Sequence, residues 1–245
     1  MSFGQDYPLE YGYSSASSIA AERAGFIRRT YAHLAGAIAA FTAVETLLLT
    51  MLSPEAKLNI LNSMLGGMSW LLVLLAFMGV GYLARYWARS QTSVSNQYLG
   101  LGLYIVAECV IFLPLLIIAT AYEQYFGKNI LGMAAILTLA VSAGLTTVVF
   151  ITKKDFSFMG PILSVCTWVA LGFILCGILF GFSLGLFFIL AMIGLMSGWI
   201  LYETSNVLHH YPTDMHVAAA LELFAAIATL FWYIVQLLMT LSSRD

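Results

Sequence analysis

Seven long apolar runs dominate this sequence and limit what it can fold into. A helix needs about 20 apolar residues to cross the hydrocarbon core of a bilayer, and each run is long enough to do so. The predicted spans are Tyr31–Leu52, Met68–Ala88, Tyr98–Ala121, Asn129–Ile151, Met159–Gly181, Ser183–Tyr202 and Val217–Leu241. The sequence therefore predicts an all-α membrane protein built as a bundle of seven transmembrane helices.

Composition supports the same class. Of the 245 residues, 61% are hydrophobic and only 9% are charged, whereas soluble domains carry about 25% charged residues. The formal net charge is −2, and no basic patch is present, so nucleic acid is not an expected partner. Residues 1–25 are polar and rich in Ser and Tyr, which predicts a flexible tail before a single membrane domain over residues 26–245.

The charges between the spans predict the orientation of the bundle. With the N-terminus inside, the inner segments hold most of the basic residues, namely Arg23, Arg28, Arg29, Arg85, Arg89, Lys153 and Lys154. The outer segments then hold only Lys57, Lys128 and Arg244. Because cytoplasmic segments of membrane proteins are enriched in Lys and Arg, we expect the N-terminus inside and the C-terminus outside.

Four glutamates lie inside the apolar runs, at Glu45, Glu108, Glu203 and Glu222. A carboxylate at membrane depth is costly and usually functional. Glu203 and Glu222 flank one short polar loop, so we expect them to face each other near the inner end of the bundle. Two acids in a low dielectric cannot both ionise cheaply, which suggests a pH-sensing gate, and their oxygens could also bind calcium.

A structural role is the alternative for each of these acids. Glu203 or Glu222 could reach water or pair with Arg85 or Arg89, which are also expected at the inner side. Glu108 lies near the middle of the third run and must face the bundle interior, either on a polar path or as a protonated acid bonded to a neighbouring helix. Glu45, in the outer half of the first run, would mark the other end of such a path.

The loop between the last two runs contains His209, His210, Asp214 and His216. Their spacing matches no established metal-ligand pattern, so a solvated loop is favoured over a metal site.

The segment from Thr147 to Gly160, which contains Lys153-Lys154-Asp155-Phe156-Ser157, resembles the fourth-to-fifth helix signature of the Bax inhibitor-1 (transmembrane Bax inhibitor motif) family. The stretches Phe26–Leu34, Leu201–Thr204 and Ala219–Phe231 are similar to further parts of that family. The resemblance covers about residues 24–241, and its overall character is that of a bacterial member.

The resemblance implies a seven-helix protein with a central last helix and a pH-sensitive calcium leak. In the family, that leak is attributed to a pair of aspartates on the last two helices, with an arginine of the second helix involved in the closed state. The first aspartate falls on Glu203, but the second falls on Ala226, which cannot ionise. Glu222 lies four residues earlier and could substitute for it, and Arg85 is the candidate arginine by position.

Two functions follow from these observations. The first is a pH-sensitive cation leak, with calcium as the expected ion, in a bacterial inner membrane, with Glu203, Glu222 and Arg85 at the gate. Glu108 and Glu45 would line its path. The alternative is a non-conducting regulatory protein with the N-terminal tail as its contact. The resemblance implies a membrane-bound ATP-dependent protease as its partner, because bacterial members of the family include a modulator of such a protease. An enzyme is not expected, since intramembrane aspartyl proteolysis needs an intramembrane Asp that this chain lacks, and no cofactor is expected beyond a calcium ion.

Overall fold

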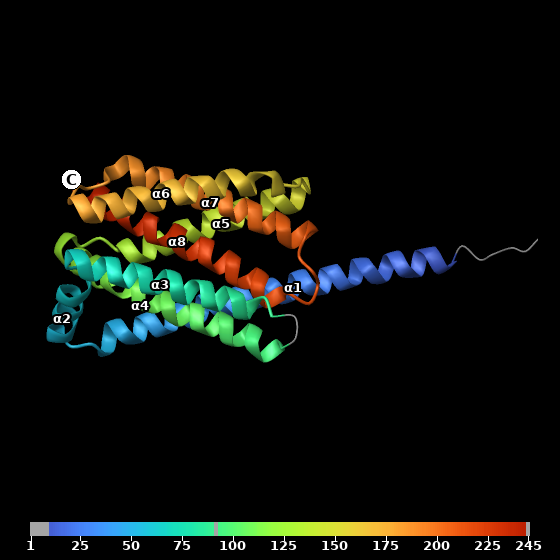
Figure 1. Ribbon diagram of the computed structural model, residues 1–245, viewed down its shortest axis with the longest axis horizontal. Helices are drawn as coiled ribbons and strands as arrows, with labels where there is room; N and C mark the ends of the chain where they lie inside the picture. Colours follow the sequence, from blue (N-terminus) through green and yellow to red (C-terminus); the bar gives the residue numbers. More distant parts are fainter. Residues whose placement is uncertain (1–9, 91–92, 244–245) are drawn as a thin grey trace, which may run out of the picture.

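The computed structural model describes residues 10–90 and 93–243, with side chains from residue 18 onward. In this part of the chain, seven helices are long and apolar enough to cross a membrane, which confirms the prediction of a seven-helix bundle. Figure 1 shows them lying roughly side by side along one axis. The helices are α1 (Glu10–Met51), α2 (Pro54–Met64), α3 (Gly67–Ala88), α4 (Val94–Phe126), α5 (Ile130–Thr152), the 3₁₀ turn η1 (Ser157–Met159), α6 (Gly160–Phe180), α7 (Gly185–His209) and α8 (His216–Ser242).

The last helix, α8, forms the centre of the bundle. It packs against α1, α4, α5 and α7, and 78% of its most apolar window is buried, compared with 56% for α4, which ranks next. Small residues, including Ala218, Ala219 and Ala220, let neighbouring backbones approach closely, as helix packing in lipid requires. The central position of α8 is therefore confirmed.

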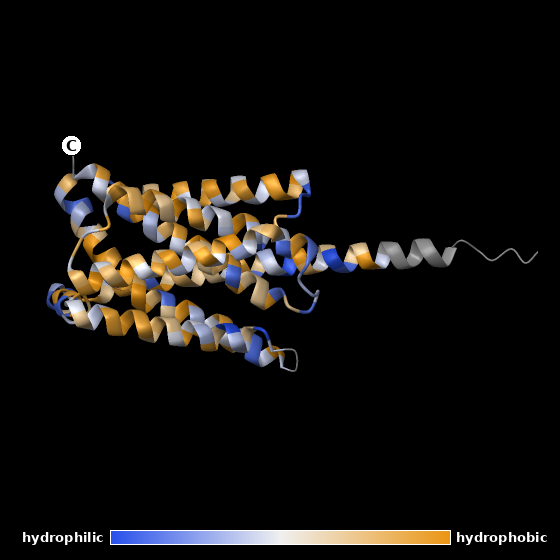
Figure 2. Cartoon of the chain, turned by 45° about the horizontal axis from the view of Figure 1, so that its top comes forward, coloured by the Kyte–Doolittle hydropathy of each residue, from blue (hydrophilic) through white to orange (hydrophobic). Residues whose placement is uncertain are grey.

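The two ends of the bundle differ in charge. One end carries the start of the packed part of α1 and the α3–α4, α5–η1 and α7–α8 connections, and we call it the basic end (Figure 1). The opposite end carries α2 and the α4–α5 and α6–α7 connections. Figure 2 shows hydrophobic residues along the shafts of the helices and hydrophilic residues gathered toward the ends. All seven basic residues predicted for the inner segments belong to the basic end.

The structure departs most from the predicted helix boundaries in three places. α1 begins at Glu10, whereas a flexible tail was predicted as far as residue 25; residues 1–9 of that tail lie outside the described part. Arg23 explains the longer helix in part, since it donates a 2.6 Å hydrogen bond to the Tyr211 carbonyl oxygen in the α7–α8 loop. α7 continues beyond Tyr202 to His209, and the first interhelical segment contains α2, which is capped by the Ser53 side chain.

The predicted spans Met159–Gly181 and Ser183–Tyr202 follow each other almost without a break, and the structure contains a turn between them. Gly181 and Gly185 have φ angles of +70°, in the left-handed region that favours glycine, so they bracket a turn in an otherwise continuous apolar stretch. By contrast, Pro114 lies within α4, and the helix continues through it.

α3 and α4 pack so closely that one glycine is required between them. A Cβ atom added at Gly100 of α4 would meet the Ala84 carbonyl oxygen and lie 2.5 Å from the Ala88 amide nitrogen. Both atoms belong to the backbone of α3, which cannot move aside as a flexible side chain could. This contact fixes the final turns of α3 against the bundle, and those turns carry Arg85 and Arg89.

Candidate functional site

The Glu222 cluster at the basic end consists of Arg85, Arg89 and Glu222. Arg85 Nε donates to Glu222 Oε2 at 3.0 Å, and Arg89 Nη2 donates to Glu222 Oε1, also at 3.0 Å. The Glu222 side chain is 13% exposed, whereas those of Arg85 and Arg89 are 38% and 59% exposed. Both carboxylate oxygens of a nearly buried acid are therefore held by guanidinium groups that reach toward solvent.

Helix geometry explains why these residues meet. Arg85 lies in the last turn of α3, and Arg89 follows four residues later as the C-cap, so both project from one face. Glu222 lies in the second turn of α8, at the same end of the bundle. A Cβ atom at Gly81 would lie 3.3 Å from Arg85 Nη1, so the glycine leaves room for the guanidinium group.

Tyr104 of α4 is a second partner of Arg85. The guanidinium carbon lies 5.0 Å from the centre of the Tyr104 ring, and Nη2 lies 3.4 Å from the Tyr104 hydroxyl oxygen. A cation over an aromatic face is attracted to its negative quadrupole. This contact holds Arg85 at the boundary between the Glu222 cluster and the buried face of α4, because Tyr104 is only 3% exposed.

Glu203 on α7 has a different partner. Its carboxylate accepts a 3.2 Å hydrogen bond from the Tyr211 hydroxyl of the α7–α8 loop, and Glu203 is 7% exposed. Burial, followed by the nearby Glu203 charge, raises the pKa of Tyr211 well above its usual range. Tyr211 therefore remains a hydrogen-bond donor to this acid across the physiological pH range.

Glu203 and Glu222 lie close enough for their charges to interact. Glu222 nevertheless uses both oxygens on Arg85 and Arg89, while Glu203 is bonded to Tyr211. A calcium ion bound by the two acids would therefore have to displace guanidinium groups from Glu222. In the described residues no group of three or more His, Cys, Asp and Glu side chains is arranged to hold a metal ion.

A cavity of about 1130 Å³ extends from this cluster into the bundle, with Glu203 and Glu222 in its wall. Ala226 also lines this cavity. It stands where the resemblance described above would place the second aspartate. Glu222 lies four residues before Ala226, which is about one turn and about 6 Å along the axis toward the basic end. The acid of α8 thus faces the same cavity, at a depth where it can reach both arginines.

Glu108 is brought to this cavity and Glu45 is not. Glu108 is 3% exposed, lines the cavity, and interacts with Tyr104, which lies one turn before it on α4. Glu45 on α1 is equally buried, but it is absent from the cavity wall in the described part of the chain, and its charge interacts with Cys109. Of the two acids, only Glu108 lies in the cavity wall as described, and the polar path through Glu108 and Glu45 stays a prediction.

Sequence reasoning missed a second polar cluster, in which Asp155 joins the α5–η1 connection to α7. Asp155 Oδ1 accepts from the Ser157 amide at 2.8 Å and from the Ser205 hydroxyl at 3.3 Å, and Oδ2 lies 2.9 Å from His210 Nε2. The Ser205 hydroxyl in turn accepts from the Phe156 amide. The signal available in the sequence was the quoted Lys-Lys-Asp-Phe-Ser segment, but its partners on α7 are about 50 residues away.

We expect Asp155→Asn to lower the unfolding temperature at pH 7. The hydrogen bond from the Ser157 amide, with further help from His210, holds the pKa of the Asp155 carboxyl below its usual range. A lowered pKa means that this stabilisation is complete above the usual carboxyl pKa of about 3.9 and is lost as pH falls through the lowered value.

Thermal unfolding in detergent at pH 7 and at pH 3 tests this expectation. The difference between wild type and variant should shrink at the lower pH. Asp214→Asn, in the exposed part of the α7–α8 loop, is the matched control and should change neither value. An equal unfolding temperature for Asp155→Asn and wild type at pH 7 would contradict a stabilising role for this cluster.

Comparison with known proteins places the chain in a family. The profile of the family described as "Inhibitor of apoptosis-promoting Bax1" matches residues 23–244. Protein lifeguard 4 of Mus musculus is 26% identical over 240 residues, covering 96% of this chain and 93% of the mouse protein. Protein LIFEGUARD 4 of Arabidopsis thaliana is 32% identical over 217 residues, covering 85% and 82%.

A bacterial relative is similar over nearly the same length. An uncharacterised protein of Pseudomonas aeruginosa is 26% identical over 234 residues, covering 93% of this chain and 95% of the relative. These relatives come from an animal, a plant and a bacterium, and they cover 96%, 85% and 93% of this chain. With its seven apolar helices around a central α8 and a family match over residues 23–244, the chain belongs to the Bax inhibitor-1 family of membrane proteins.

Proposed function

We propose that the protein is a pH-sensitive cation leak, with calcium as the permeant ion, and that the Glu222 cluster holds its gate closed. The observation that carries the proposal is the pairing of one nearly buried carboxylate on the central helix with two arginines of α3. Membership of the Bax inhibitor-1 family supports it. Glu203 and Glu108, in the wall of the same cavity, are the further acids that a passing cation would meet.

The direction of the pH dependence follows from charge. Ionised Glu222 attracts both guanidinium groups and so ties the end of α3 to α8. Because two acids in a low dielectric cannot both ionise cheaply, we assign the proton taken up as pH falls to the Glu203–Glu222 pair. There it reduces the negative charge that holds the like-charged Arg85 and Arg89 together. Lower pH therefore favours separation of α3 from α8, and we expect the leak to increase as pH falls.

Calcium is the expected ion because it binds carboxylates, and this opening would free the carboxylates from the arginines. Carboxylate oxygens are the ligands that calcium prefers, and it accepts irregular coordination completed by water. While Arg85 and Arg89 are bound to Glu222, their positive charge lies beside Glu203 and opposes the entry of a cation. Once they leave, the ionised fraction of Glu203 and the oxygens of Glu222 face the cavity together.

The charge asymmetry supports the same orientation as the sequence. We place the basic end in the cytoplasm, because Lys and Arg are enriched in cytoplasmic segments. The bacterial relative of nearly full length supports a bacterial inner membrane as the location.

Flux through purified protein in liposomes tests the proposal. Calcium entry, followed by a trapped indicator dye from pH 8 to pH 6, should exceed that of protein-free liposomes and increase toward pH 6. The paired variant Glu203→Gln/Glu222→Gln should lose this pH dependence. Flux equal to protein-free liposomes at every pH would overturn the proposal in favour of the non-conducting regulatory role, and unchanged pH dependence in the variant would overturn the assignment of the gate.

A further inference from the structure

The cavity that begins at the Glu222 cluster crosses most of the membrane. Its wall includes Glu222 near one end of α8 and Gln236 near the other. These residues are 14 positions apart (236 − 222), which is about 21 Å at 1.5 Å per residue. One leaflet of hydrocarbon is about 15 Å thick, half of the usual 30 Å core. The cavity is therefore long enough to hold a lipid chain that enters from one leaflet.

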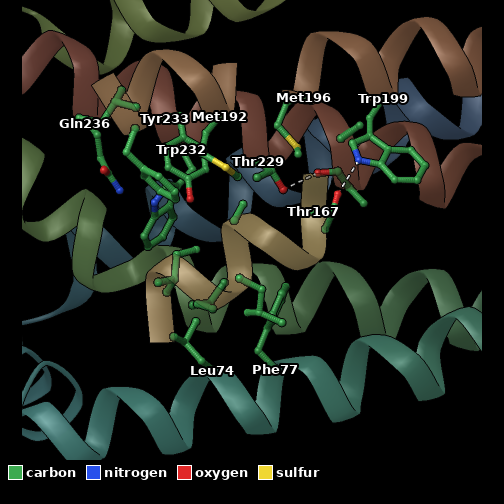
Figure 3. A pocket seen from close by; sticks show the side chains of 18 of the residues that line it. Leu74, Phe77, Thr167, Met192, Met196, Trp199, Thr229, Trp232, Tyr233 and Gln236 are labelled. Carbon is green, nitrogen blue, oxygen red and sulfur yellow. Dashed lines mark hydrogen bonds between the residues drawn. The ribbon is translucent and has the colours of Figure 1, made fainter. Parts of the chain in front are cut away.

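The middle of this cavity is apolar. Figure 3 shows Leu74 and Phe77 of α3 on one side, facing Trp232 and Tyr233 of α8 on the other, with Met192 of α7 beside them. Their side chains offer hydrocarbon, ring and thioether surface to whatever lies between them. This surface favours burial of a hydrocarbon chain over water.

Two threonines and one indole of the cavity wall, those of Thr167, Thr229 and Trp199, have partners within the protein. Thr167 donates to the Leu163 carbonyl oxygen at 2.8 Å, and Thr229 donates to the Ala225 carbonyl oxygen at 2.8 Å. Trp199 Nε1 donates to Thr167 Oγ1 at 3.0 Å, the contact drawn in Figure 3. Because a buried water needs two to four polar partners, these three side chains offer little to a file of water.

The cavity opens toward lipid. Met78 of α3 and Phe182 of the α6–α7 turn both line it, yet they are 40% and 46% exposed. Met78 lies within a membrane span, so the medium at this mouth is bilayer hydrocarbon. Phe182 lies at the opposite end of the bundle. The mouth therefore faces the leaflet at that end.

We propose that the cavity is a lipid site, which holds one acyl chain of a phospholipid from the leaflet at the opposite end. The chain enters past Met78 and Phe182, its head group stays at the membrane surface near Gln236, and its terminal methyl points toward the Glu222 cluster. Phospholipid is the occupant because it is the molecule that surrounds the mouth at this depth. In that position the chain separates the acids at the basic end from the polar residues at the opposite end. The inference therefore concerns the closed state of the proposed leak, and the chain must leave the cavity before a cation can pass.

Photolabelling in nanodiscs tests this site. The probe is a phosphatidylcholine with a diazirine near the middle of one acyl chain, and adducts are located by peptide mass spectrometry after illumination. We expect adducts on Phe112 and Met192, which line the cavity and are only 2% and 6% exposed. Trp168, 68% exposed on the outside of α6, is the positive control for contact with bulk lipid. Adducts confined to such exposed residues would overturn the proposal.

A matched pair of variants and two further probes sharpen the result. Thr229→Trp fills the middle of the cavity and should abolish the adducts on Phe112 and Met192. Gly144→Trp adds the same bulk in open space on α5 and should leave them unchanged. The same phospholipid with its diazirine in the head group should not label Phe112, and labelling by it would overturn the orientation. Labelling of Phe112 by a free diazirine fatty acid but not by the phospholipid would overturn the choice of lipid.

Discussion

Glu222→Gln is expected to raise the calcium leak at pH 8 by roughly ten- to a hundredfold and to remove its dependence on pH. Two hydrogen bonds between charged groups contribute about 3–6 kcal/mol when buried, but Arg85 and Arg89 are 38% and 59% exposed, so solvent screening reduces this to about 1.4–2.8 kcal/mol. Each 1.4 kcal/mol corresponds to a tenfold change in an equilibrium. The amide keeps the size of the side chain and removes the charge that attracts Arg85 and Arg89. The measurement is dye-reported calcium entry into liposomes from pH 8 to pH 6.

The two arginines should contribute unequally to this result. Arg85 is the less exposed and also contacts Tyr104, so Arg85→Gln should raise the leak more than Arg89→Gln. Arg89 is the more exposed of the two, and solvent screens its pairing with Glu222 more strongly. Glu55→Gln, an exposed acid of α2 at the opposite end, is the control and should behave as wild type. A Glu222→Gln protein that leaks no more than wild type at pH 8 would contradict the proposed role of the cluster.

Gly100→Ala is expected to destabilise the protein by about 1–3 kcal/mol, because overpacking a tight contact costs that amount. The added methyl group would meet the backbone of α3 at Ala84 and Ala88. Relief of that overlap must push α3 away from α4. The unfolding temperature should fall by several degrees, since a domain of this size loses about 2–4 °C per kcal/mol.

The same displacement should also disturb the gate. Arg85 and Arg89 directly follow Ala84 and Ala88 in the chain, so a shift of these turns moves both guanidinium groups relative to Glu222. We therefore expect a higher leak at pH 8 together with the lower unfolding temperature. Gly102→Ala, two residues further along α4, places its methyl group in open space and is the matched control. Equal behaviour of the two alanine variants would show that the contact between α3 and α4 does not constrain the gate.

The seven spans were predictable because the requirement for a membrane helix is local. Each helix must satisfy its own backbone and expose apolar side chains to lipid, so a run of about 20 apolar residues is sufficient evidence for it. Helix ends are set by tertiary contacts and were less predictable. α7 extends to His209 through a polar segment that buries Ser205 and Val207, and the Arg23 contact with the α7–α8 loop helps to hold α1 in helix well before residue 31.

The acids of the candidate site could be predicted from the sequence, but the residues that pair with them could be predicted only in part. The cost of a charge in the membrane singled out Glu108, Glu203 and Glu222, and the structure brings all three to one cavity. The sequence could not show that Glu222 pairs with both arginines while Glu203 bonds to Tyr211, since these contacts join helices far apart in the chain. Tyr104 could have been found, because it lies four residues before Glu108 and so on the same helical face.

The most direct test of the account is a double-mutant cycle on calcium leak at pH 8. Its corners are wild type, Glu222→Gln, Arg85→Gln/Arg89→Gln, and the variant that combines all three changes. If these residues close the gate through one cluster, the combined variant should leak no more than Glu222→Gln alone, because the same contact is broken once. If the effects are instead additive in free energy, the fold-increase of the combined variant equals the product of the two separate fold-increases. That result would show that the acid and the arginines act independently and would contradict the account.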